Sequence, residues 1–138
     1  MRLLIFFIVV LSTSVAQAQQ YQIGDKVVAI TKVPLTLDGK EVAKSFPGKM
    51  HVVAKLKGDQ IWVEKPKSGW LESKNVIPLD QAIPFFSKAI EKEPDNLAWR
   101  FGRATLLRDK GELDASITDL TELIRRQPSD AKYWCARG

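Results

Sequence analysis

The chain of 138 residues carries a formal net charge of +5 at pH 7, and 45% of its residues are hydrophobic. It has one cysteine and one histidine, which excludes an internal disulfide and a metal site built from several such side chains. The fold must therefore rest on the burial of apolar side chains. Because Cys135 lies inside a predicted helix, we expect it to be a buried structural thiol, with intermolecular pairing or a reactive thiol as the alternative.

The first residues have the features of a secretory signal peptide. Arg2 supplies one positive charge, an apolar run follows from Leu3 to Leu11, and residues 16–18 have the small-residue pattern Ala-Gln-Ala. The apolar run has about half of the ~20 residues that a membrane-spanning helix needs. We therefore expect cleavage after Ala18, with an uncleaved anchor as the alternative. The prediction is a protein exported to the periplasm or the cell exterior, with no transmembrane segment after cleavage.

Residues 19–78 contain short stretches of alternating hydrophobicity separated by turn residues. Asp38-Gly39 and Pro47-Gly48 are two of these turn signals. Five or six short strands in about 60 residues predict a small closed or nearly closed β-barrel. The clearest strand-like stretches are Lys26–Ile30, Val52–Leu56, Ile61–Val63 and Gly69–Leu71.

These residues also resemble Src-homology-3-like barrels, particularly those that follow signal peptides in bacterial exported proteins. The resemblance rests on Gly24-Asp25 before the first strand, Ile61-Trp62-Val63, Gly69-Trp70-Leu71 and Asn75-Val76. Other small barrels fit the alternation nearly as well. The acidic-aromatic first loop with which the eukaryotic members bind proline-rich peptides is missing, so the resemblance does not imply that kind of recognition.

Trp62 is the candidate binding residue of this region. With Ile61 and Val63 facing inward, Trp62 points to the opposite face, where it either anchors a ligand or covers the barrel mouth or the junction with the following residues. For Trp70 we favour a structural role. The region has ten scattered lysines, no arginine and six acidic residues, a pattern that favours charged strand edges over a nucleic-acid site. We therefore predict no specific nucleic-acid partner.

From residue 79 onward the sequence repeats with a period of 34 residues. A fixed period of this length predicts helix-turn-helix units, each of which leaves an apolar face for its neighbour to cover. An ordinary helical hairpin with a chance echo is the alternative. Ala82, Phe86, Ala89, Ile90 and Pro94 return as Ser116, Leu120, Leu123, Ile124 and Pro128, and Trp99 and Arg103 return as Tyr133 and Arg137.

The period, the small residue and aromatic at Ala82 and Phe86, and the closing Pro94 and Pro128 make residues 79–138 similar to the tetratricopeptide repeat. Gly111 stands where that family turns between its two helices. We expect helices over about 79–93, 96–109 and 112–126, with the last repeat incomplete.

Several local features of this region carry expectations of their own. Asp80 is a plausible N-cap, and Pro84 must then sit in the first turn of its helix. The barrel is expected to stand in for a missing first helix. Tyr133 and Trp134 lack the second helix that would normally cover them.

These features together predict an α+β chain, a small Src-homology-3-like β-barrel followed by an α-helical tetratricopeptide-type repeat array, and not an enzyme. The lone His51 lies in a strand-like run, which favours a structural or surface role. Acidic residues such as Asp114 and Asp119 have the spacing of solvated helix charges. No cofactor and no metal are implied.

By the resemblance, the repeat groove is lined by Ala98, Phe101, Thr105 and Arg108. These residues lack the Lys and Asn arrangement that clamps a partner's C-terminal carboxylate. We expect a protein or peptide partner to dock by apolar burial around Phe101, with Arg108 giving polar selectivity. Two alternatives remain open: the lysine-rich barrel binds cell-wall polymer or another acidic envelope surface with the helices as a spacer, or the chain is a non-catalytic accessory piece of a larger envelope assembly.

Overall fold

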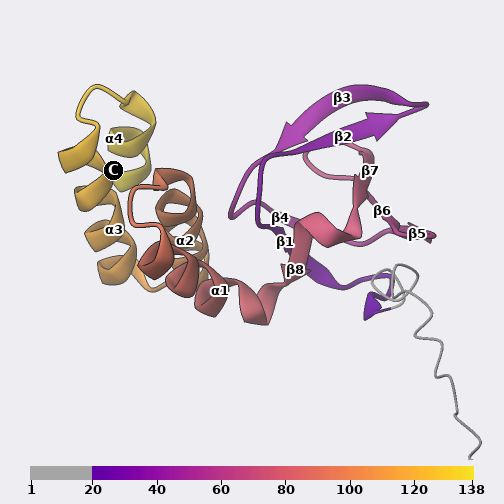
Figure 1. The fold of residues 1–138 in the computed structure, drawn as a ribbon, viewed down its shortest axis with the longest axis horizontal. Coiled ribbons are helices and arrows are strands. Elements are labelled where there is room, and N and C mark those ends of the chain that lie inside the picture. Colours follow the sequence, from indigo (N-terminus) through magenta and orange to yellow (C-terminus); the bar gives the residue numbers. More distant parts are fainter. Residues whose placement is uncertain (1–19) are drawn as a thin grey trace, which may run out of the picture.

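The computed structural model describes residues 20–138, and the predicted signal peptide, residues 1–18, lies outside them. An all-β region up to Pro78 is followed directly by helices that begin at Leu79. The helices stack side by side away from the β region, with α3 and α4 farthest from it (Figure 1). The α+β class expected from the sequence is confirmed.

Eight short strands of the described chain form two antiparallel sheets. The three-stranded sheet has the order β4-β1-β8, and the five-stranded sheet has the order β3-β2-β7-β6-β5. The strands are β1 (Lys26–Ala29), β2 (Val33–Leu37), β3 (Lys40–Ser45), β4 (Met50–Val52), β5 (Lys55–Lys57), β6 (Gln60–Val63), β7 (Gly69–Glu72) and β8 (Val76–Pro78).

Of the closed and nearly closed forms expected for the barrel, the closed one is wrong, because the two sheets remain separate. The single strand expected over Val52–Leu56 is divided between β4 and β5, which belong to different sheets. The edges of the larger sheet are β3 and β5, and both carry exposed lysines. Charged side chains on an edge strand disfavour further pairing, so the lysines do serve as edge charges.

One apolar core lies between the two sheets. Along β6, Ile61 and Val63 are fully buried while Trp62 is only half-buried, which confirms that Trp62 points away from the core. This burial on one face and exposure on the other follows from the two-residue period of a strand. The core is formed by Tyr21, Val27, Ala29, Val33, Leu35, Val53, Ile61, Val63, Leu71 and Val76.

The first three helices begin and end within one residue of the expected positions, and a fourth helix follows them. They are α1 (Leu79–Lys92), α2 (Leu97–Lys110), α3 (Leu113–Arg126) and α4 (Ala131–Arg137). Gly111 ends α2 with a φ of 88°, a conformation that glycine adopts without steric cost. The four residue pairs at the 34-residue spacing in α1 and α3 are all buried: Ala82 and Ser116, Phe86 and Leu120, Ala89 and Leu123, and Ile90 and Ile124.

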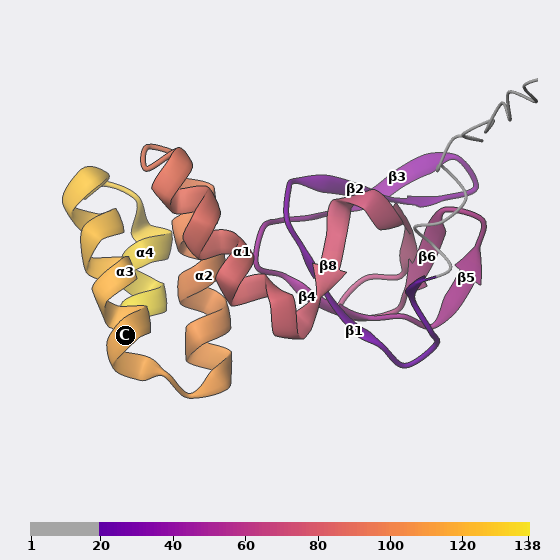
Figure 2. The same cartoon turned by 60° about the horizontal axis from the view of Figure 1, so that its bottom comes forward.

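The start of α1 differs from the expectation. The helix begins at Leu79, so Pro78 holds the cap position and the Asp80 side chain makes no capping bond. Pro84 consequently lies inside the helix rather than in its first turn. A proline there removes the hydrogen bond to the carbonyl of Asp80. The helix changes direction on its way from β8 to its C-terminal half (Figure 2).

The β region packs directly against α1 and α2. Val28 of β1 is fully buried in one cluster with Phe86 of α1 and Leu106 of α2. The indole Nε1 of Trp99 also donates a hydrogen bond of 3.2 Å to the carbonyl oxygen of Ile30. These contacts join the two regions through buried apolar surface.

The last helix is better covered than expected. Tyr133 is buried against Phe101, Leu120 and Leu123, so the expectation that it lacks cover is wrong. Trp134 is 46% exposed, and the expected burial of Cys135 is also wrong. The reason is helical spacing: Tyr133 and Ala136 face α2 and α3, which turns Cys135 toward solvent.

Candidate functional site

A cavity of about 310 Å³ opens where the β region meets α2. This volume is at the lower end of the range for sites that hold small ligands or single side chains of a partner. Its walls come from the loop between β3 and β4, the loop between β6 and β7 and one face of α2, together with one residue from each of the strands β2, β3 and β4. The lining residues are Leu35, Lys44, Phe46, Pro47, Gly48, Lys49, His51, Pro66, Lys67, Phe101 and Thr105.

Two of the residues expected in the groove, Phe101 and Thr105, line this cavity. The Thr105 hydroxyl donates a 3.0 Å hydrogen bond to the backbone carbonyl of Phe101, one turn earlier, so this hydroxyl is already satisfied within α2. The ring of Phe101 is half-buried and lies 5.4 Å from the ring of Tyr133, centroid to centroid. Phe101 thus connects the cavity to α4.

The other expected site residues lie elsewhere. Ala98 is exposed one turn before Phe101 and does not line the cavity. Arg108 is exposed, and its guanidinium lies 3.6 Å from the carboxylate of Asp109. Trp62 lies on the outer face of the five-stranded sheet, edge to face with Trp70 at 5.3 Å between ring centroids. The structure therefore brings Phe101 and Thr105 together and leaves the remaining three apart.

The charged groups around the cavity are all cationic. Lys44, Lys49 and Lys67 line it, and no acidic residue of the described chain does. The Lys44 ammonium is 3.2 Å from the carboxylate of Glu41, whereas Lys49 and Lys67 form no ion pair with any residue from 20 to 138. Two ammonium groups without an ion-pair partner among the described residues therefore lie at the edge of a largely apolar cavity.

His51 lies at the base of the same cavity and is 3% exposed. Its Nε2 is 2.7 Å from the hydroxyl of Ser45, and its Nδ1 has no hydrogen-bond partner among the described residues. Burial lowers the pKa of the imidazole below its ordinary value. The positive charge of Lys49 lowers this pKa further, whereas the backbone of Lys65 raises it. The ring is therefore neutral at pH 7, and the structural role expected from the sequence fits this burial.

A larger cavity of about 830 Å³ lies on another side of the junction, between the β region and the start of α1. Its lining combines three acidic residues with two lysines, so it has no charge preference that would define a ligand. None of the sequence-derived site residues lines it. The smaller cavity is therefore the stronger candidate.

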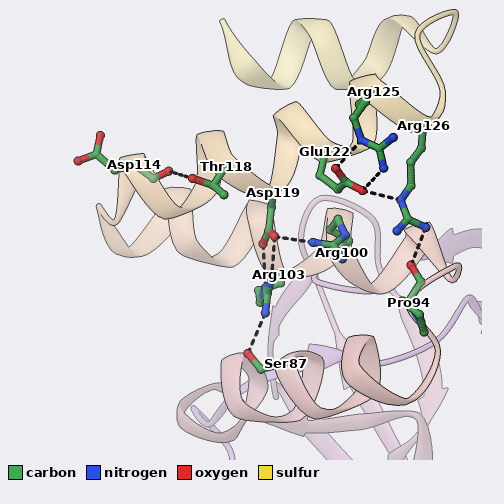
Figure 3. Close-up of polar contacts among 10 residues, drawn as sticks. All are labelled: Ser87, Pro94, Arg100, Arg103, Asp114, Thr118, Asp119, Glu122, Arg125 and Arg126. Atoms are coloured by element: carbon green, nitrogen blue, oxygen red, sulfur yellow. Dashed lines mark hydrogen bonds and ion pairs between the residues drawn. The ribbon is translucent and has the colours of Figure 1, made fainter.

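Asp119 holds the helices together and is not the solvated charge expected from the sequence. Asp119 is 3% exposed, and its carboxylate accepts two hydrogen bonds from Arg103, of 2.7 and 2.8 Å, and one of 3.3 Å from Arg100 (Figure 3). Arg103 also donates to the hydroxyl of Ser87 in α1. The network joins α1, α2 and α3, and the neighbouring carboxylate raises the pKa of Arg103.

Glu122 forms a second charged cluster at the end of α3. It accepts hydrogen bonds from Arg125 and Arg126, which lower the pKa of its carboxyl to about 2 (Figure 3). Arg126 also reaches the backbone carbonyl of Pro94 and the carboxylate of Asp95 in the α1–α2 loop. Both clusters pair their carboxylates with arginines inside the helical region and serve the packing of the helices, although the buried Nε of Arg100 has no hydrogen-bond partner among residues 20–138.

The sequence pointed to α2 but missed the β-region half of the cavity. Phe46, Lys49 and Lys67 lie in loops, where no periodic pattern marks which side chains converge. The only available signal was the Pro47-Gly48 turn, which places Lys49 beside α2. In residues 20–138 no group of three or more histidine, cysteine or acidic side chains is placed to hold a metal ion. That part of the chain also contains no helix with the length and apolar character needed to cross a bilayer.

Comparison with known proteins supports the repeat. The family model described as tetratricopeptide repeat matches residues 79–138. No curated protein and no solved structure matches the chain. The helices from α1 to α4 are thus a tetratricopeptide-like array, whereas the resemblance of the β region to Src-homology-3-like barrels stays a prediction.

Proposed function

We propose that this chain is an exported, non-enzymatic interaction module that binds a peptide or a segment of a partner protein in the cavity between the β region and α2. The observation that carries the proposal is the convergence of Phe101 and Thr105 with loops of the β region around one apolar hollow. The match to the tetratricopeptide repeat supports it, because arrays of this kind are interaction modules. Export rests on the sequence of residues 1–18.

The surface has the chemistry of a recognition site. Phe46, Pro47, Pro66 and Phe101 supply apolar walls that suit a buried side chain of a partner. The cavity belongs to neither region alone, so a ligand contacts both at once. Because buried contacts already join the two regions, the site is formed before binding. The binding free energy is therefore not reduced by the cost of ordering the site.

A display selection tests this proposal. Random twelve-residue peptides are selected on the purified protein, and the affinities of the enriched peptides are measured by calorimetry. Thr105→Arg places a long side chain into the cavity and should weaken binding at least tenfold. The matched control is Thr121→Arg, the same exchange at an exposed position of α3, which should leave the affinity unchanged.

The two variants make the outcome decisive. Circular dichroism spectra are compared with that of the wild-type protein to check that both variants remain helical. If no peptide is enriched, or if the enriched peptides bind the Thr105→Arg and Thr121→Arg proteins equally well, the cavity is not the binding site and the proposal is wrong.

A second candidate function is adhesion to an acidic envelope polymer through the β region. It is favoured by a row of side chains across the five-stranded sheet, where Lys55, Trp62 and Trp70 are cross-strand neighbours. The Lys55 ammonium lies 5.5 Å from the centre of the Trp62 ring. The test is co-sedimentation with cell-wall polymer at rising salt concentration; Trp62→Ala should abolish sedimentation if this surface binds, and Thr105→Arg should not affect it.

A further inference from the structure

We infer that the partner segment bound in this cavity is an acidic peptide in which an apolar side chain is flanked by carboxylates. This inference rests on the proposed function and names the chemistry of its ligand. It follows from the arrangement of charge around the hollow, which the sequence does not reveal.

The first step of the argument is the asymmetry of charge. Lys44, Lys49 and Lys67 surround the opening, and no carboxylate in the part of the chain that the structure describes lines it. Lys44 is paired with Glu41, but Lys49 and Lys67 have no ion-pair partner within residues 20–138. Unneutralised charges of one sign at the edge of a cavity attract ligands of the opposite sign and repel cationic ones.

The second step is a further cation, which α4 places beside an aromatic ring of the cavity wall. The Lys132 ammonium of α4 lies 5.9 Å from the centre of the Phe101 ring, on the ring that also lines the cavity. Lys132 is held by Asp130 at 2.7 Å and raises the local positive potential less than the free lysines do. A bound segment that crosses Phe101 therefore comes close to a further cation, on α4.

The third step separates an acidic peptide from other polyanions. The hollow between the lysines is walled by Phe46, Pro47, Pro66 and Phe101, which a phosphate backbone or a uronic-acid chain does not fill. Arginine, which binds phosphate with two hydrogen bonds, does not line the cavity. Carboxylates around an apolar side chain match both the charge of the opening and the chemistry of its interior.

Charge-reversed variants test the inference. Peptides enriched on the wild-type protein should carry an excess of aspartate and glutamate next to a leucine, phenylalanine or similar residue. Lys49→Glu and Lys67→Glu should each weaken their binding about tenfold, and the neutral variants Lys49→Gln and Lys67→Gln should do so by a smaller factor. Lys57→Glu and Lys88→Glu are matched controls at exposed positions outside the cavity and should change the affinity less than twofold.

The peptides provide the reciprocal test. Replacing the glutamates of an enriched peptide with glutamines should reproduce the loss seen with Lys49→Glu and Lys67→Glu, and raising the salt concentration from 50 to 300 mM should weaken only the acidic form.

Three results would overturn the inference. Enriched peptides without an acidic excess that are still blocked by Thr105→Arg would leave the proposed function standing and remove the inference alone. Peptides unaffected by Thr105→Arg would remove both. Equal competition by heparin, or by vesicles containing phosphatidylserine, would show that the lysines attract any polyanion and that the cavity selects nothing.

Discussion

Gly48 and Gly102 meet backbone to backbone where the β3–β4 loop crosses α2. A Cβ atom on Gly102 would lie 2.9 Å from the carbonyl carbon of Pro47 and 3.0 Å from the backbone nitrogen of Gly48. Gly48 adopts a φ of 85°, which side chains other than glycine rarely tolerate. The absence of both side chains lets the loop approach α2 closely enough to form the cavity.

Gly102→Ala is therefore expected to destabilise the protein although it improves helix propensity. Alanine in a helix gains about 1 kcal/mol over glycine, whereas forcing two backbones apart costs about 1 to 3 kcal/mol, so we expect a net loss of about 1 kcal/mol. Urea unfolding followed by circular dichroism measures the change. Thr121→Ala, at an exposed position of α3, is the control and should be neutral or slightly stabilising. A stabilising effect of Gly102→Ala would contradict the proposed close approach.

Asp119→Asn should destabilise the helical array much more than Asp114→Asn. The first change keeps the shape of the side chain but removes the charge that pairs with Arg103 and Arg100. Removing one partner of a buried pair is strongly destabilising. Such a removal typically costs about 3 to 5 kcal/mol, and because the guanidinium groups retain some contact with water, we expect a loss at the lower end, about 3 kcal/mol.

Asp114 provides the comparison because it is exposed in the first turn of the same helix. Its neutralisation removes a favourable interaction with the helix dipole, worth less than about 1 kcal/mol. Chemical unfolding of the two variants under identical conditions gives the difference directly. Equal losses would show that the Asp119 network contributes nothing beyond an ordinary surface charge.

Tyr133→Ala should release α4 from the array, whereas Trp134→Ala should not. Tyr133 is 2% exposed and packs against Phe101, while Trp134 is largely exposed and makes one hydrogen bond, to the carbonyl of Pro128. Truncating a buried aromatic side chain costs about 3 kcal/mol or more. Hydrogen exchange of the α4 amides should accelerate in the Tyr133 variant and stay near the wild-type rate in the Trp134 variant. The reverse order would mean that Trp134 holds the helix in place.

The helices were predictable from the sequence because their packing is periodic. The apolar positions recur every 34 residues, and Gly111 and the repeated prolines mark the ends, so the bounds of α1, α2 and α3 follow within one residue. The turn at Asp38-Gly39 was also recognisable, and both residues adopt positive φ there. All of these features depend on residues that are close together in the sequence.

Strand pairing and buried charge were not predictable in the same way. Alternation tells which side of a strand is apolar but not which strand it pairs with, so the division of Val52–Leu56 between two sheets was missed. Asp119 has the spacing of a surface charge in α3, and only the position of Arg103 on α2 explains its burial. The cavity likewise depends on loops brought together by the Gly48 and Gly102 contact.

His51 is expected to make the stability of the protein decrease as the pH falls below about 7. Burial keeps the pKa of the folded imidazole below its ordinary value of 6.5, so the unfolded chain takes up a proton at a higher pH than the folded chain does. The stability that comes from keeping the imidazole neutral is therefore complete at about pH 7. It is lost as the pH falls below about 6.5, and the free energy of unfolding then decreases by at most about 1.4 kcal/mol per pH unit. His51 is the only histidine of the chain, so this slope has one main source.

His51→Gln tests this origin, because glutamine keeps a polar group near the hydroxyl of Ser45 but does not titrate. Urea unfolding at pH 7.5, 6.5 and 5.5 should give a falling free energy for the wild-type protein and a nearly constant one for the variant, even if the variant is less stable throughout. Glu122 does not interfere, because its folded pKa of about 2 and ordinary value of 4.5 place its own effect at more acidic pH. The same slope in both proteins would show that His51 does not remain neutral in the fold.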